Sequence, residues 1–186
     1  MDKNKLTKYI TLLLYIMYAF SAVIVIKEKE VINIIIIVFC VAATIALVII
    51  NKKNKKLLSD NLYIVSALFI MISSLLGSCY NFYDISHYDD FLHVWSGLIS
   101  CTVAFSLITF FYNENQLKDL NKVFLIIFLF MFSMGVASLW EIAEFFLDTY
   151  FGMNMQVGGL KDTIIDMIDA LVGTVIMIPF IIKNKK

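Results

Sequence analysis

Six long apolar stretches constrain this chain more than any other feature of its sequence. A helix needs about 20 mainly apolar residues to cross the roughly 30 Å hydrocarbon core of a membrane. Stretches of about that length lie at residues 9–26, 31–50, 62–80, 91–112, 123–147 and 163–182. Strands of membrane barrels alternate apolar and polar residues, whereas these stretches are unbroken apolar blocks. The sequence therefore predicts an all-α, polytopic bundle of about six transmembrane helices, forming a single integral membrane domain over residues 1–186.

The composition fits a membrane environment and excludes several other classes of protein. Of the 186 residues, 61% are hydrophobic and only 16% are charged, whereas a soluble domain has roughly 45–50% apolar and about 25% charged residues. Basic and acidic residues are equal in number, which argues against nucleic acid as a partner and leaves the lipid bilayer. The three cysteines lie inside apolar stretches, as small core residues do. The sequence leaves protein partners and oligomeric state open.

The lysines predict which way the chain crosses the membrane. Cytoplasmic loops carry more Lys and Arg than the loops on the other side. With the N-terminus inside, the cytoplasmic segments contain twelve lysines, and the outer loops contain only Lys27, Lys29 and Lys161. We therefore expect both termini in the cytoplasm. Abundant Ile, Lys and Asn with no Arg indicate an AT-rich genome, so we expect the cytoplasmic membrane of a bacterium.

Acidic side chains gather at one end of each of the last three stretches, and one histidine joins them in the fourth. An ionised side chain at the membrane centre costs roughly 2.5–3.5 kcal/mol on insertion scales, so such residues tend to mark function. The lysine topology puts all three groups at the same depth, one or two turns below the outer surface. They are Asp89, Asp90 and His93 in the fourth stretch, Glu141, Glu144 and Asp148 in the fifth, and Asp162, Asp166 and Asp169 in the sixth.

The spacing of these residues predicts three polar faces that meet inside the bundle. Residues three and four apart share one face of a helix. The three faces are Asp89, His93, Ser96 and Ser100; Ala137, Glu141, Glu144 and Asp148; and Asp162, Asp166, Asp169 and Gly173. Small residues allow close approach of helix backbones. We expect this role for Gly97, Gly135, Ala137, Ser138 and Gly173.

Eight carboxylates with Lys161 as the only nearby cation need a positive partner. Two like charges about 4 Å apart repel by roughly 4 kcal/mol at an effective dielectric near 20. Either several carboxyls hold protons, or a cation neutralises them. Oxygen ligands with one imidazole suit a divalent ion such as Mg²⁺, Mn²⁺ or Zn²⁺ as cofactor. The candidate metal ligands are Asp89, His93, Glu141, Glu144, Asp162, Asp166 and Asp169, and His93 and Glu144 are also the candidate catalytic residues.

Simpler interpretations apply to several of the neighbouring residues. We expect Asp90, Asp148 and His87 at the water interface, and the tryptophans and Tyr88 as interfacial anchors. For the buried acids the simpler role is hydrogen bonding between helices. A single polar residue on each helix would suffice for that role, so the pattern favours a functional site.

Three segments resemble the signature of a known family, the YjdF-type small inner-membrane proteins of bacteria. The segments are Tyr88-Asp89-Asp90-Phe91-Leu92-His93 with Gly97, Glu141-Ile142-Ala143-Glu144-Phe145, and Asp162-Thr163-Ile164-Ile165-Asp166-Met167 with Gly173. The family usually has an acid before its Asp-Thr pair, whereas Gln156-Val157-Gly158-Gly159 has none, and Asp169 is an addition. The resemblance implies a multi-pass membrane protein without an assigned reaction.

Three functions remain open at this point. The first is a metal-dependent hydrolase or transferase acting on a lipid-linked or small substrate near the extracytoplasmic face. The second is a proton- or cation-coupled transporter, although the inner half of the last three stretches offers few polar residues beyond Ser106, Thr109, Ser133 and Thr174. The third is a non-catalytic membrane accessory protein. The sequence does not decide whether the protein is an enzyme.

Overall fold

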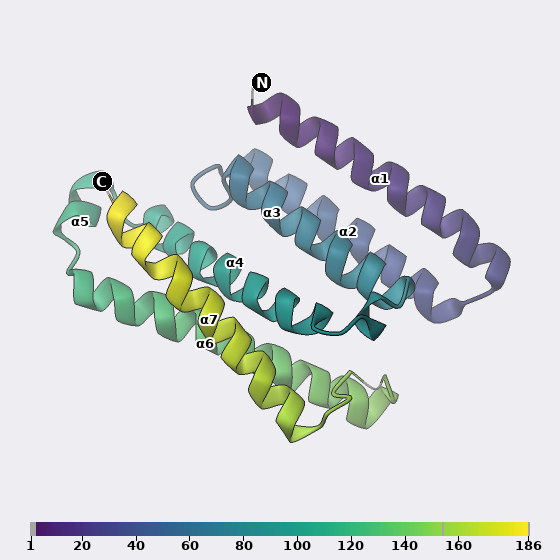
Figure 1. The fold of residues 1–186 in the computed structure, drawn as a ribbon. Helices are drawn as coiled ribbons and strands as arrows, with labels where there is room; N and C mark the ends of the chain where they lie inside the picture. Colours follow the sequence, from purple (N-terminus) through teal and green to yellow (C-terminus); the bar gives the residue numbers. More distant parts are fainter. Residues whose placement is uncertain (1–2, 154, 186) are drawn as a thin grey trace. The chain divides into compact units, whose positions relative to one another are not determined.

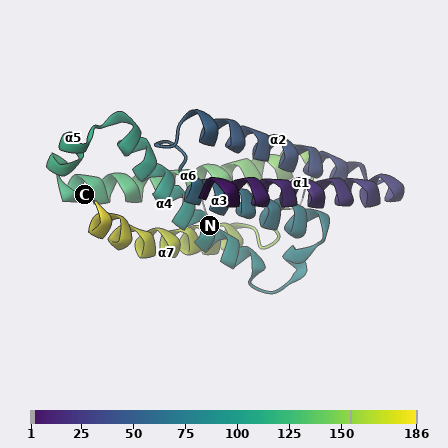
Figure 2. The same cartoon turned by 90° about the horizontal axis from the view of Figure 1, so that it is seen from above.

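The computed structural model describes residues 3–153 and 155–185 and divides into two compact helical units, residues 1–88 and 89–186. Figure 1 and Figure 2 show the helices of each unit. In the described residues all the long elements are helical, which confirms the predicted fold class. The single domain over residues 1–186 stays a prediction, and Lys186, which belongs to the predicted cytoplasmic lysines, lies outside the described residues.

The first unit contains three long helical elements that contact one another pairwise. Helix α1 spans Lys3–Glu28 and α2 spans Val31–Lys53. Helix α3 spans Asp60–Ile70 and continues without a break as a π-helical segment, Met71–Cys79. A short 3₁₀ turn, Phe82–Asp84, follows. The contacts join α1 to α2, α2 to α3 and its π-helical extension, and α1 to α3.

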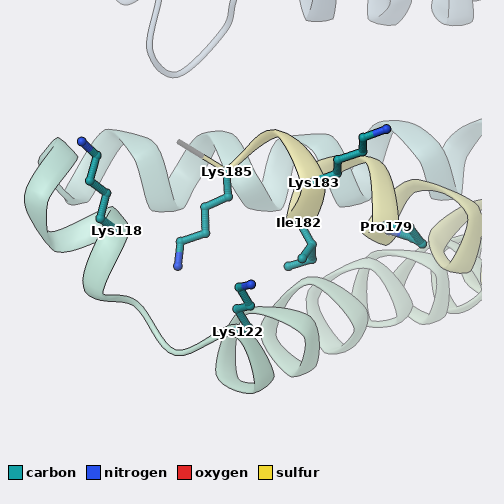
Figure 3. Close-up of a pocket in the computed structure, with 6 residues that line it drawn as sticks. All are labelled: Lys118, Lys122, Pro179, Ile182, Lys183 and Lys185. Atoms are coloured by element: carbon teal, nitrogen blue, oxygen red, sulfur yellow. The ribbon is translucent and has the colours of Figure 1, made fainter.

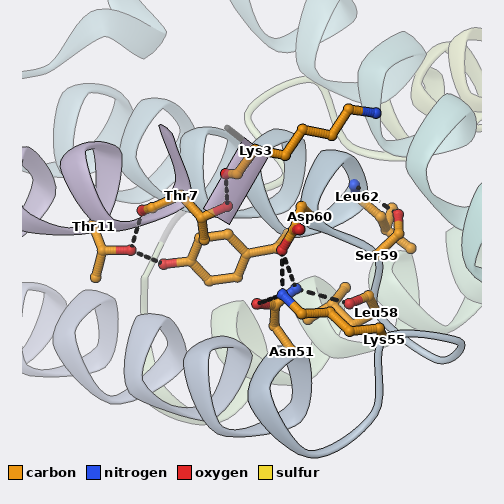
Figure 4. Close-up of polar contacts among 10 residues, drawn as sticks. Lys3, Thr7, Thr11, Asn51, Lys55, Leu58, Ser59, Asp60 and Leu62 are labelled. Atoms are coloured by element: carbon orange, nitrogen blue, oxygen red, sulfur yellow. Dashed lines mark hydrogen bonds and ion pairs between the residues drawn. The ribbon is translucent and has the colours of Figure 1, made fainter. Parts of the chain in front are cut away.

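Polar contacts tie the lysine-rich end of this first unit together. The side-chain amide of Asn51 donates to the carbonyl of Leu58 over 2.8 Å, and Lys55 forms an ion pair with Asp60. Ser59 caps α3 by accepting from the backbone N–H of Leu62, as a serine N-cap does. These contacts, drawn in Figure 4, fix the connection between α2 and α3.

The second unit carries the predicted acidic residues and consists of three long helices and one short one. Helix α4 spans Tyr88–Phe111, α5 spans Glu114–Asp119, α6 spans Lys122–Phe151 and α7 spans Leu160–Asn184. In Figures 1 and 2, α4, α6 and α7 run alongside one another, and α5 lies beside the C-terminal end of α7. The turns at Asn113 and Asn121 are closed by asparagine side chains that cap α5 and α6.

Six helices in the described residues are long and apolar enough to cross a membrane. They are Lys3–Glu28, Val31–Lys53, Asp60–Cys79, Tyr88–Phe111, Lys122–Phe151 and Leu160–Asn184. Each contains one of the six predicted stretches to within a residue. Large apolar side chains cover their outer surfaces, for example Phe145 and Ile168, which are about half exposed. This surface is suited to lipid rather than water, so the chain is an integral membrane protein.

Two glycines bring α4 and α7 into direct backbone contact. A Cβ atom added to Gly97 would lie 2.1 Å from the carbonyl oxygen of Ala170, and one added to Gly173 would lie 2.0 Å from that of Val94. The prediction of close approach is therefore confirmed for both glycines. It is wrong for Gly135, where an added Cβ would meet nothing within 4 Å, because this residue lies on an exposed face of α6.

Below this crossing, the three helices enclose first a hydroxyl pair and then an apolar core. Ser133 Oγ and Thr174 Oγ1 lie 2.6 Å apart, and the Ser133 hydroxyl also lies 3.2 Å from the carbonyl of Gly97. Toward the lysine-rich end, the space between α4, α6 and α7 is filled by buried apolar residues: Cys101, Ala104, Ile108, Leu125, Leu129 and Ile181. The acidic ends of the helices thus lie on the other side of the glycine crossing from this core.

Candidate metal centre

The imidazole of His93 lies between two carboxylates that come from different helices. His93 Nε2 is 3.4 Å from Oδ1 of Asp89, one turn earlier on α4, and 3.8 Å from Oδ1 of Asp166 on α7. His93 and Asp166 are buried, whereas Asp89 is half-buried at the rim. The glycine crossing explains the juxtaposition, because His93 is one turn from Gly97 and Asp166 is one turn from Ala170.

The geometry of these three residues fits a metal ion better than a set of direct hydrogen bonds. At 3.8 Å, Nε2 and the Asp166 oxygen are too far apart for a good hydrogen bond. Ligand atoms on a tetrahedron with metal–ligand bonds of about 2.1 Å are separated by about 3.4 Å. One donor atom from each of Asp89, His93 and Asp166 lies within 4.8 Å of the other two, so a small contraction would close the site around an ion.

Glu141 on α6 brings a third carboxylate to the same site. Its side chain is 5% exposed, and Oε2 is a buried atom without a hydrogen-bond partner in the described residues. The carboxylate interacts electrostatically with His93 and Asp166 and lies near Thr163 and Gln156. Burying a carboxylate oxygen without a partner is costly, and a proton or a cation on this oxygen would lower that cost.

Glu144, the second predicted catalytic residue, is buried but belongs to neither group of potential metal ligands. Its Oε1 accepts a 2.7 Å hydrogen bond from the indole N–H of Trp140, one turn earlier on α6. The sequence indicates only an interfacial-anchor role for the tryptophans. The spacing of four residues between Trp140 and Glu144 could have indicated this contact.

A second acidic group shares one residue with the first. Asp90, Asp166 and Asp169 each offer an oxygen within 4.8 Å of the others, so Asp166 belongs to both groups. Asp90 and Asp169 are half-buried. The position of Asp90 at the water interface stays a prediction. Asp162 belongs to neither group. It lies in the first turn of α7, where a carboxylate is favourable to the helix dipole, and its side chain faces Gly158.

Asp148 has a structural role that its sequence position did not reveal. Its carboxylate accepts hydrogen bonds from the backbone N–H groups of Met155, over 2.5 Å, and Gln156, over 2.7 Å. The side chain of Gln156 then donates to Thr163 Oγ1 and to the carbonyl of Glu141. Asp148 is half-buried and holds the connection from α6 to α7. Its position at the water interface stays a prediction.

With its carboxyls ionised, the site is negative in either state of the imidazole. Asp89, Asp166 and Glu141 would then provide three carboxylates, and a protonated His93 would cancel only one. Two carboxylate oxygens within 4.8 Å of each other repel by roughly 3.5 kcal/mol or more at an effective dielectric of about 20. Lys161 is exposed and makes no ion pair with another described residue. A proton on one of the carboxyls or a bound cation would each lower this repulsion.

Comparison with known proteins assigns the chain to a family. The family described as "Predicted membrane protein (DUF2238)" matches residues 9–186. The chain belongs to this family. The match covers five of the six long apolar helices in full, α1 from its residue 9 onward, and all the predicted site residues, and the family has no assigned activity. Neither the curated proteins nor the solved structures gave a match to the chain.

Proposed function

We propose that this membrane protein binds a divalent cation at the acidic end of its second unit, near the extracytoplasmic face. The observation that carries the proposal is the position of His93 Nε2, 3.4 Å and 3.8 Å from carboxylate oxygens of Asp89 and Asp166. The buried Oε2 of Glu141 supports it, because this oxygen has no hydrogen-bond partner among the described residues. The ligands would come from α4, α6 and α7, so the ion would join the three helices.

The donor set favours some ions over others. Mg²⁺ prefers six oxygen ligands and keeps several waters, whereas an imidazole suits Zn²⁺ and is accepted by Mn²⁺. One imidazole with two or three carboxylates therefore favours Mn²⁺ or Zn²⁺. The three closest donors leave coordination positions for water or substrate, as in catalytic rather than structural sites.

The activity that we propose is metal-assisted hydrolysis or group transfer on a lipid-linked or small substrate. A bound divalent ion activates water and polarises the bond under attack. With His93 in the ligand set, the remaining buried base is Glu144, oriented by Trp140. We assign it the role of general base. Replacing Glu144 by Gln should then abolish metal-dependent hydrolysis of lipid-linked substrates and leave the bound metal in place.

Elemental analysis of the purified full chain tests the metal site directly. Wild-type protein should contain about one Mn²⁺ or Zn²⁺ ion per chain after expression with both metals. The His93→Ala and Asp166→Asn variants should each retain less than a tenth of the metal content of the wild type. The matched controls are His87→Ala, the other histidine, which is exposed, and Asp119→Asn, an exposed acid on α5. Metal-free wild-type protein, or equal metal in variants and controls, would refute the site.

Cation or proton transport is the second candidate function, and the core of the second unit disfavours it. A conduction path needs polar groups toward the cytoplasmic side. Beyond the Ser133–Thr174 pair, the residues between the three helices are apolar. We therefore expect no flux of Mn²⁺ or protons into liposomes that contain the protein. Flux that is lost in Asp166→Asn would replace the enzymatic proposal with transport, and an accessory role would remain if metal and flux were both absent.

A further inference from the structure

A pocket lined by lysines lies at the opposite end of the second unit from the acidic site. It has a volume of about 570 Å³ and is lined by Lys118, Lys122, Pro179, Ile182, Lys183 and Lys185. These residues come from α5, α6 and the end of α7, so three helical elements contribute to one cavity. In Figure 3, Lys122 and Lys185 extend toward each other between the start of α6 and the end of α7, whereas the side-chain ends of Lys118 and Lys183 point away from this space.

The positive charge of this pocket is not neutralised within the described part of the chain. None of its lining residues is acidic. The ion pairs of the described residues do not include Lys118, Lys122, Lys183 or Lys185. The ammonium group of Lys185 donates to the backbone carbonyl of Leu120, which holds it over the pocket without cancelling its charge. The N-terminus of α6 adds the positive end of a helix dipole.

The surroundings of the pocket are apolar, which indicates the kind of ligand. Val123 and Phe124 follow Lys122 on α6 and are 64% and 51% exposed. Phe180, next to Pro179 on α7, is 58% exposed. A ligand with a phosphate group and acyl chains would use both the lysines and the apolar surroundings. The lysines would bind its phosphate, and the exposed aromatic and aliphatic residues would contact its acyl chains.

We propose that this pocket binds the phosphate group of an anionic phospholipid from the cytoplasmic leaflet. Lys122 and Lys185 contact the phosphate, Lys118 and Lys183 add to the local potential, and the acyl chains lie along α6 and α7. The predicted topology agrees, since it places these lysines at the cytoplasmic surface. Lysines concentrated there for topology alone need no shared cavity, whereas four of them line this one.

Lipid binding by the purified full chain tests the proposal. Native mass spectrometry in a non-ionic detergent would measure the affinity for phosphatidylglycerol, with phosphatidylcholine as the zwitterionic comparison. Each lysine at a membrane surface contributes about fivefold to affinity, so Lys122→Gln with Lys185→Gln should weaken phosphatidylglycerol binding by about twenty-fivefold. The matched control is Lys52→Gln with Lys53→Gln, which replaces two exposed lysines at the end of α2. The control variant has the same overall charge as the pocket variant.

The outcomes separate a lipid site from simpler explanations. A loss confined to the pocket variant, with unchanged metal content, supports the proposal. Equal losses in the pocket and control variants would overturn it, because they would show only a general attraction to anionic lipid. Inorganic phosphate that binds as tightly as phosphatidylglycerol would also overturn the assignment to a lipid. If the double variant fails to fold, Lys122→Gln alone should weaken phosphatidylglycerol binding by about fivefold.

Discussion

Replacing Gly97 by Ala perturbs the helix crossing that positions the proposed metal ligands. The added Cβ would lie 2.1 Å from the backbone oxygen of Ala170. A backbone atom cannot rotate away as a side chain does, so α4 and α7 must separate by about 1.3 Å to restore ordinary contact. His93 and Asp166 lie one turn from the crossing on the two helices, and their 3.8 Å separation would grow to about 5 Å.

The expected cost follows from the overpacking of a tight contact. Forcing an extra carbon into a packed interface costs about 1–3 kcal/mol. For a unit the size of residues 89–186, each kcal/mol lowers Tm by roughly 4–8 °C, so a cost of about 1–3 kcal/mol lowers Tm by roughly 4–24 °C. Metal affinity should fall at least tenfold, because the two ligands on separate helices no longer reach one ion.

The buried cysteine of this unit provides the assay. Cys101 has no exposed surface, so a thiol-reactive dye labels it only when residues 89–186 unfold. Replacing Cys40 and Cys79 by Ala leaves Cys101 as the only thiol. The matched control is Gly135→Ala on α6, where the added Cβ meets nothing within 4 Å. The control should keep or raise Tm, because Ala favours the helix over Gly by up to about 1 kcal/mol.

Two results would refute this reasoning. The first is a Gly97→Ala protein as stable and as rich in metal as the wild type, which would mean that the backbones of α4 and α7 do not touch. The second is an equal loss of stability in Gly135→Ala, which would mean that the cost comes from the residue type and not from the crossing.

Three further predictions concern the surroundings of the site. Ser133→Ala should cost about 1 kcal/mol, and a double-mutant cycle with Thr174→Val in thermal unfolding should give a coupling of about 0.6 kcal/mol rather than additive losses. Asp148→Ala should increase protease cleavage after α6, because Gln156 N–H loses its acceptor, whereas unchanged cleavage would argue against that anchor. A metal chelator should lower the Tm of the wild type and not of His93→Ala, so equal shifts would contradict metal binding at the site.

The sequence predicted the membrane helices well, because long apolar stretches allow few alternatives in a bilayer. It also predicted that acids of the last three helices share one end of the bundle, since helix direction and residue spacing are regular. It did not predict the partners of Asp148 and Glu144. The first depends on the course of a loop, and the second on a rotamer of Trp140. It also assigned Gly135 to an interface from residue type alone, and only the rotation of α6 shows otherwise.

Hydrophobicity and charge along the chain were therefore enough to predict six helices long and apolar enough to cross a membrane, the acidic ends of the last three and the lysine-rich segments, because each of these properties belongs to a local stretch of residues. Tertiary structure decided which of eight acids face His93 and which lysines share a cavity. Those choices depend on how far one helix turns and how closely it approaches its neighbour. The contacts of Gly97 and Gly173 set both quantities between α4 and α7.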